Sequence, residues 1–282
     1  MYFGAVLISF SPIFVSLVHV NPTASAFYRV FIGGIALTLY LLFSRKRFDF
    51  SKSVWFFLLM ASIFFAADLW FWHRSVIYVG PGLGTLLANM QVFIMMMAGI
   101  FLYKQIPTRV QLFSFPFAVI GLFMIVGLDW SELKPNYQAG IIFGLLTAIC
   151  YSSYLISMRQ AQQSKTNIIP IREVAVMSLM VSIILALTAF FENESLVVEE
   201  PNDYLILLIY GIGSHAIGGI MIASALVRVS TTEVGIALLL QPTLSFVWEI
   251  LFFNRSFSVI ESLGVIIVLY SIFLSSNRTA RS

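Results

Sequence analysis

Three charged side chains and two histidines interrupt long apolar segments of the sequence: Arg29, Asp68, His73, His215 and Glu249. A charge inside hydrocarbon is costly, and in membrane proteins such residues usually bind a substrate, carry a proton or pair with one another. These positions are therefore the first candidates for chemistry.

Arg29 and Asp68 lie at similar predicted depths on consecutive helices. Equal depth makes a buried ion pair easy to form, and such a pair would fix the register of the two helices more than it would add net stability. Asp68 is also a candidate for binding substrate or a proton. The sequence leaves both interpretations open.

Glu249 has no evident partner at its predicted depth, because Arg255 follows it by almost two helical turns. A carboxylate without a counter-ion in an apolar medium is a candidate for proton exchange. Glu249 shares a helix face with Gln241 and Ser245, and such a polar stripe must face protein or water rather than lipid. We therefore treat Gln241 and Ser245 as candidate substrate contacts.

Further candidate substrate contacts combine aromatic rings with amide or hydroxyl groups, as small-molecule pockets do. His215 lies near the predicted midplane among glycines, where it either binds substrate or bonds a neighbouring helix. Trp72 is either a cavity residue or part of the interfacial aromatic belt. The other candidates are Asn89, Gln91, Tyr151 and Tyr154.

The sequence lacks the clustered groups that an intramembrane enzyme or a metal site needs. It has no Asp-rich diphosphate motif and no HExxH motif, and its three histidines fall on separate segments. The single cysteine, Cys150, allows neither a CxxC site nor an intrachain disulfide. We predict no enzyme activity, no cofactor and no metal.

Ten apolar segments occupy most of the 282 residues, of which 60% are hydrophobic and 10% charged. A helix of about 20 residues spans the hydrocarbon core of a bilayer. The chain is therefore predicted to be an all-α integral membrane protein surrounded by lipid. The predicted helices are residues 2–20, 24–43, 54–73, 82–102, 110–128, 138–158, 174–191, 204–226, 233–253 and 259–276.

Lysine and arginine residues are concentrated in alternate connections, including Arg45, Lys46 and Arg47. This asymmetry predicts that both termini are cytoplasmic. We expect a multi-pass protein of a bacterial inner (plasma) membrane. The segment 192–200, which is rich in glutamate, is then on the outer side, together with the connections that hold Arg74 and Arg255.

The predicted helices divide into two groups of five, residues 1–128 and 138–276, with a linker at 129–137 and a cytoplasmic tail at 277–282. Similar helix spacing and weak identities, such as Gly84 with Gly235, suggest that the halves are repeats. Because five is odd, the two repeats must be inverted relative to each other, as in many secondary transporters.

With these features the chain resembles the drug/metabolite transporter superfamily, in particular its EamA-like ten-helix branch. The local motifs that carry the resemblance are Arg29, residues 79–87, residues 151–154 and residues 240–242. The chain also departs from the family pattern. Gln91 stands where relatives typically have a proline in the fourth helix, and Lys104 and Arg255 stand where they have glutamates after the fourth and ninth helices.

The resemblance implies a secondary active carrier of small metabolites, linked to protons or to another gradient, and commonly an exporter of amino acids or related compounds. We expect it to work by alternating access. An importer or facilitator is the alternative, and a channel or an intramembrane enzyme is less favoured. No nucleic acid is expected as a partner. Gly33 and Gly34 either pack within the chain or support a homodimer.

Overall fold

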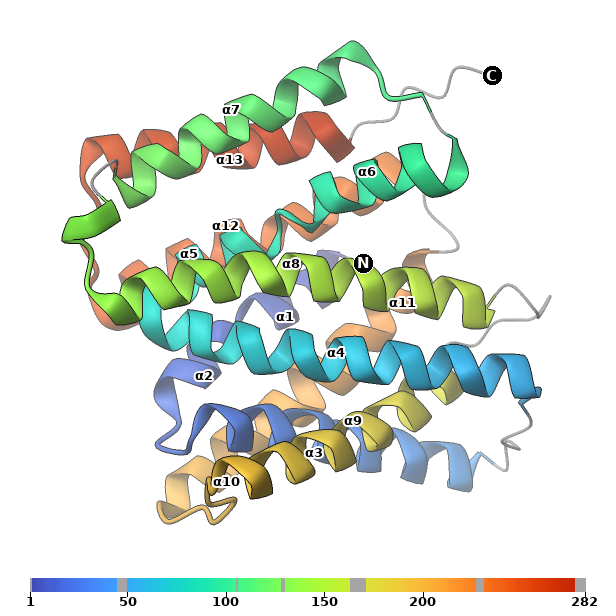
Figure 1. Ribbon diagram of the computed structural model, residues 1–282. Helices are drawn as coiled ribbons and strands as arrows, with labels where there is room; N and C mark the ends of the chain where they lie inside the picture. Colours follow the sequence, from blue (N-terminus) through green and yellow to red (C-terminus); the bar gives the residue numbers. More distant parts are fainter. Residues whose placement is uncertain are drawn as a thin grey trace.

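The computed structural model describes residues 2–44, 50–104, 106–127, 130–162, 171–226 and 231–276, and within these residues the structure consists of helices joined by loops and turns (Figure 1). The helices are α1 (Tyr2–Ser9), α2 (Ser11–Leu17), α3 (Pro22–Phe43), α4 (Lys52–Val79), α5 (Pro81–Ala88), α6 (Gln91–Tyr103), α7 (Arg109–Val126), α8 (Pro135–Gln162), α9 (Ile171–Glu192), α10 (Pro201–Ile209), α11 (Gly219–Leu226), α12 (Thr231–Phe253) and α13 (Val259–Ser276). A short 3-10 turn spans Trp130–Glu132, and a π-helix spans Tyr210–Gly218.

Within the described residues, seven helical segments are long and apolar enough to cross a membrane. Shorter apolar helices at Tyr2–Leu17, Leu238–Phe253 and Val259–Ser275 accompany them. Each of the ten predicted segments thus coincides with an apolar helix. That the three shorter ones also cross the bilayer stays a prediction, as does the inverted relation of the two halves.

Three of the predicted membrane helices are irregular near their middle. The first is divided at Phe10, next to Pro12, into α1 and α2. The fourth is divided at Asn89 and Met90 into α5 and α6. The eighth widens into the π-helix Tyr210–Gly218 between α10 and α11. Irregular backbone at membrane depth is tolerated where it is buried in protein or lines a cavity.

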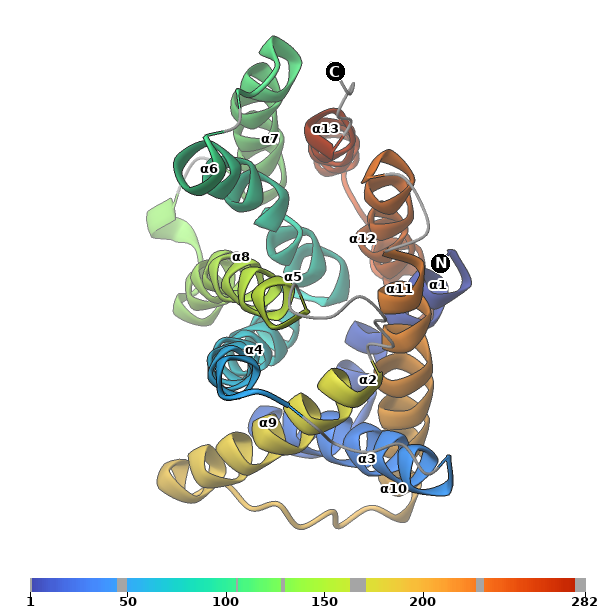
Figure 2. The same ribbon diagram turned by 90° about the vertical axis from the view of Figure 1, so that its right-hand side faces the viewer.

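The largest helix contacts join the two halves of the chain. α4 packs against α8, α3 against α9 and α7 against α13, and Figure 2 shows α7 and α13 together at one edge of the bundle and α3 and α9 at the opposite edge. In the α7–α13 contact, a Cβ added to Gly121 or Gly264 would come within 2.8 or 2.7 Å of the other residue's carbonyl oxygen. The absence of side chains there therefore allows the two helices to approach closely.

Two boundary predictions were wrong. The third predicted helix does not end at residue 73 but continues to Val79, so Arg74 lies inside α4 rather than in an outer loop. α8 begins at Pro135, within the predicted linker. The basic residues 45–47 and the tail at 277–282 lie outside the described residues, and the orientation of the chain stays a prediction. We use "the predicted outer end" for the end at which α4, α9 and α12 finish, on the left in Figure 1.

Candidate functional site

A cavity of about 180 Å³ lies between helices of the two halves. It is smaller than the roughly 300–1,000 Å³ of pockets for drug-sized ligands. The divided helices and the π-helix all contribute to its lining, through Ser11, Gln91 and Ser214 among others. The irregular backbone therefore lies at the cavity, as expected for non-helical backbone at membrane depth.

Six residues that line this cavity carry a buried polar atom without a hydrogen-bond partner among the described residues. Leaving such an atom unsatisfied costs about 1–3 kcal/mol, so a bound ligand or water is expected to complete these bonds. The atoms are Ser11 Oγ, Arg29 Nε, Asp68 Oδ1, Thr85 Oγ1, Gln91 Oε1 and Thr147 Oγ1.

The cavity is lined by both an acidic and a positively charged side chain, Asp68 on α4 and Arg29 on α3. Within the described part of the chain no ion pair joins them, so the direct pair, one of the two interpretations that the sequence left open, is not formed there. The later end of α4 explains this difference. Measured along the helix axis, Asp68 lies about 16 Å from Val79, the last residue of α4. Arg29 lies only about 10 Å along the axis from Pro22, the first residue of α3.

Arg29 is instead held by aromatic groups and a hydroxyl. Its guanidinium carbon lies 5.3 Å from the ring centre of Trp72 and 5.2 Å from that of Tyr210, within the range of cation–π attraction. Its Nη1 donates a hydrogen bond to Tyr210 Oη at 3.2 Å. The Tyr210 hydroxyl also lies 3.2 Å from His73 Nε2. His73 is fully buried.

An aromatic wall closes another side of the cavity. The ring centres of Phe65 and Tyr154 are 4.6 Å apart, and those of Tyr151 and Tyr154 are 5.3 Å apart. His215 faces this wall, with its ring centre 6.2 Å from that of Phe65, and its Nε2 lies 2.8 Å from Ser178 Oγ on α9. His215 therefore makes the predicted interhelical bond and lines the cavity as well.

Most of the sequence-predicted site residues line this one cavity. They are Arg29, Asp68, Trp72, Asn89, Gln91, Tyr151, Tyr154, His215 and Gln241. Trp72 is buried and is thus a cavity residue. Gly33 and Gly34 pack against the π-helix and α9 inside the chain, because added Cβ atoms would meet His215 and Ser178.

Ser245 and Glu249 do not line the cavity, although both face protein as the polar stripe predicted. The Ser245 hydroxyl lies 2.7 Å from the carbonyl oxygen of Gln241 and 3.2 Å from that of Ser9. It therefore bonds backbone on α12 and at the end of α1.

The prediction that Glu249 has no partner is wrong. Its Oε1 accepts a hydrogen bond from Arg255 Nη1 at 2.6 Å, and its Oε2 accepts one from the Gly82 N–H at 2.7 Å. Arg255 also donates to the carbonyl oxygen of Val79 at 3.1 Å. Because the chain turns back after α12, Arg255 reaches Glu249 in spite of their separation along the sequence. The pair ties α12 to the junction between α4 and α5.

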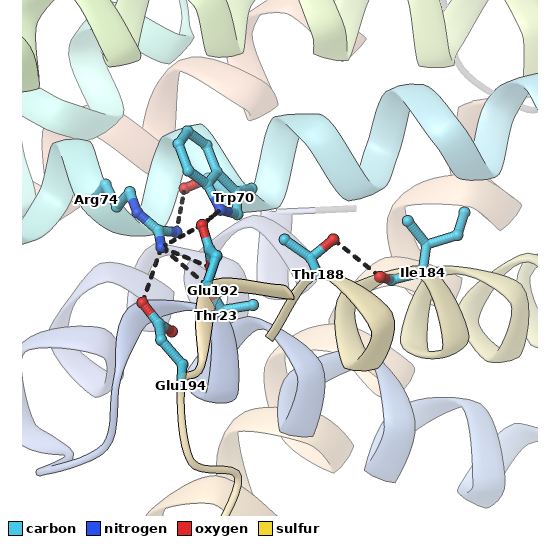
Figure 3. A network of polar contacts seen from close by, with 7 residues as sticks. All are labelled: Thr23, Trp70, Arg74, Ile184, Thr188, Glu192 and Glu194. Carbon is cyan, nitrogen blue, oxygen red and sulfur yellow. Dashed lines mark hydrogen bonds and ion pairs between the residues drawn. The ribbon is translucent and has the colours of Figure 1, made fainter. Parts of the chain in front are cut away.

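A second ionic network lies at the predicted outer end (Figure 3). Arg74 Nη2 lies 3.0 Å from carboxylate oxygens of both Glu192 and Glu194, and 3.0 Å from Thr23 Oγ1. The Trp70 indole N–H donates a hydrogen bond to Glu192 at 2.7 Å. The centre of the Trp70 ring lies 3.9 Å from the guanidinium carbon of Arg74. This network joins α4 to the beginning of α3 and the end of α9.

Sequence reasoning missed Tyr210 and Ser11 as site residues. The chain has 11 tyrosines, and Tyr210 follows an apolar run in which a buried tyrosine needs no special function. Only its place in the π-helix, beside Arg29 and His73, distinguishes it. Ser11 lies at the divided first helix, and the adjacent Pro12 was the available signal.

Comparison with known proteins agrees with this architecture. The model of the EamA-like transporter family matches residues 1–127 and 138–277. A solved crystal structure of a protein is 17% identical to this chain, superposes with a TM-score of 0.70, and is matched over 97% of this chain and 96% of that one. That likeness shows the shared fold. The comparison with curated proteins gives no match. Since the family model covers nearly the whole sequence, the chain belongs to the EamA-like transporter family.

Proposed function

We propose that this protein is a secondary active exporter of amino acids or related small metabolites, and that the cavity is its substrate site. Membership of the family indicates a membrane transporter of small molecules. The observation that carries the proposal further is that six residues lining one cavity each hold a buried polar atom without a partner among the described residues. Donor and acceptor groups set between aromatic walls suit a small zwitterion.

Asp68 is the proposed site of proton coupling. It is the one carboxylic acid among the described residues that line the cavity, and its Oδ1 has no hydrogen-bond partner there. Glu249 is engaged by Arg255 and Gly82 and does not line the cavity, so we assign the exchange to Asp68 in preference to Glu249. A carboxylate that binds either a proton or a substrate ammonium group would couple the two by competition.

Alternating access is the proposed mechanism. The two halves would rock about the cavity, with the divided helices and the π-helix taking up the change in backbone angles. The ionic contacts at the predicted outer end, Arg74 with Glu192 and Arg255 with Glu249, would form when that end closes and break when it opens. Proton entry from outside and release inside would accompany each cycle.

The test is transport in proteoliposomes preloaded with mixed radiolabelled amino acids, with and without a pH gradient. We expect gradient-driven efflux from wild-type vesicles and loss of the gradient dependence in Asp68→Asn. Glu261→Gln is the matched control, because Glu261 lies on α13, hydrogen-bonds its own helix start at Ser258 and does not line the cavity. If Asp68→Asn retained full gradient dependence, the coupling assignment would be wrong. If no amino acid moved through folded wild-type protein, the assignment of amino acids as substrates would be wrong.

A further inference from the structure

We propose that Arg29 binds the anionic group of the transported molecule, and that Tyr210 and His73 are positioning residues that hold its guanidinium in the cavity. The inference rests on the proposed function, because it assigns one end of the substrate within the same cavity. It predicts that the transported molecule must carry a carboxylate or a similar anion.

A series of hydrogen bonds leads from α4 to Arg29, and the donor and acceptor of each can be assigned. His73 Nδ1 lies 2.7 Å from the Leu69 carbonyl oxygen, which can only accept, so Nδ1 carries the proton. In neutral His73 the other nitrogen, Nε2, therefore accepts a hydrogen bond, and the donor is the Tyr210 hydroxyl at 3.2 Å. The Tyr210 oxygen then has its lone pairs free to accept from Arg29 Nη1.

This series of hydrogen bonds holds the Arg29 guanidinium with residues from three helical elements. Arg29 itself comes from α3, Tyr210 from the π-helix, and His73 and Leu69 from α4. Trp72 and Tyr210 present their rings to the guanidinium at 5.3 and 5.2 Å. An arginine that is held by rings and one hydroxyl is pre-organised and keeps donors for a ligand.

Arg29 has an unused donor. Its Nε has no hydrogen-bond partner among the described residues, although Arg29 lines the cavity. Asp68, the one acid among the described residues that line the cavity, does not form an ion pair with Arg29. A guanidinium binds a carboxylate through two parallel N–H donors. A substrate carboxylate at this position would satisfy the Nε donor and neutralise the charge.

The geometry also separates the two ends of a zwitterion. Asp68 lies one helical turn from Trp72 along α4 and is available to an ammonium group, whereas Trp72 contacts Arg29. The carboxylate would thus lie toward Tyr210 and the ammonium group toward the aromatic wall of Tyr151 and Tyr154. A molecule with only one of these charges would leave the other buried group without a counter-charge.

The experiment compares α-amino acids with their carboxamides, which have the same side chain and ammonium group but no anion. Binding of a panel of such pairs is measured by thermal stabilisation of the purified full-length protein. The variants are Arg29→Gln, Arg29→Lys and Tyr210→Phe. Tyr28→Phe is the matched control, because it removes a tyrosine hydroxyl on α3 that bonds the Leu196 carbonyl outside the cavity.

We expect the wild type to bind the amino acid at least about tenfold more tightly than its carboxamide, as for a hydrogen bond to a charged group. Arg29→Gln should abolish this preference, and Arg29→Lys should restore part of it. Tyr210→Phe should reduce the preference several-fold without changing carboxamide affinity, a result that a purely structural role of Tyr210 would not give. Tyr28→Phe should behave as the wild type.

Failure of the Arg29 assignment and failure of the proposed function would give different results. Equal affinities for amino acid and carboxamide in the wild type, or an undiminished preference in well-folded Tyr210→Phe, would overturn the assignment of Arg29 while leaving the carrier in place. The absence of binding by every amino acid and every carboxamide would remove the amino-acid exporter itself, and with it this inference. Tyr210→Phe keeps the test decisive if Arg29→Gln fails to fold.

Discussion

Replacing Glu249 tests whether this buried carboxylate holds the bundle together or carries protons. Its side chain is 3% exposed and that of Arg255 is 25% exposed. A buried hydrogen bond to a charged group contributes about 1.5–3 kcal/mol, and partial exposure of Arg255 places that bond at the lower end because solvent screens it. The bond to the Gly82 N–H, at the start of α5, is fully buried.

The two bonds together amount to about 3 kcal/mol, so Glu249→Ala should lower the melting temperature by roughly 6–12 °C. Glu249→Gln keeps an acceptor for the Gly82 N–H but loses the charge, and we expect about half that effect. The measurement is thermal unfolding in detergent, monitored as the loss of monodisperse protein with increasing temperature. Glu199→Gln, which removes an exposed acid, is the control. The structural role of Glu249 would be refuted if both variants melted with the wild type while gradient-driven transport was lost.

Three further substitutions test the outer end and the cavity. Arg74→Gln removes the cation shared by two carboxylates and should cost about 3 kcal/mol, read as a lower melting temperature that high salt does not restore. Gly80→Ala places a side chain at φ +94°, where its Cβ would also meet Glu249, so it should destabilise by at least about 1–2 kcal/mol in the same assay. Gly33→Ala would bring a Cβ to 2.5 Å from His215 Cδ2 and should reduce ligand affinity in a binding titration, and unchanged affinity would show that His215 is not held against α3.

The helical segments and most cavity residues could be predicted from the sequence, because apolar runs set the helices and polar residues inside them must face protein. Helix ends were harder to predict. His73, Arg74 and Ser75 look like a polar loop, but each is bonded by distant groups: Ser75 donates to the Gly140 carbonyl at 2.7 Å, and Arg74 binds Glu192. Such tertiary partners, more than 60 residues away, leave no local pattern.

The same limit explains the errors at the charged sites. The depth of Asp68 in the membrane depends on where α4 ends. Because tertiary bonds extend α4 to Val79, Asp68 lies deeper than the sequence predicted and is not level with Arg29. The pairing of Glu249 with Arg255 depends on how the chain turns after α12, which helical spacing along the sequence does not describe. The division of the fourth helix at Asn89 lacks a proline or glycine at the break and so gave no sequence signal.

The central claim is that the cavity between the two halves is the substrate site. The most direct measurement is thermal stabilisation by the amino-acid panel in the wild type and in Ala88→Phe, which fills the cavity from α5 with a side chain. The account predicts ligand-dependent stabilisation of the wild type and none of Ala88→Phe, with both proteins monodisperse. Equal stabilisation of both would show that ligands bind elsewhere and would contradict the account.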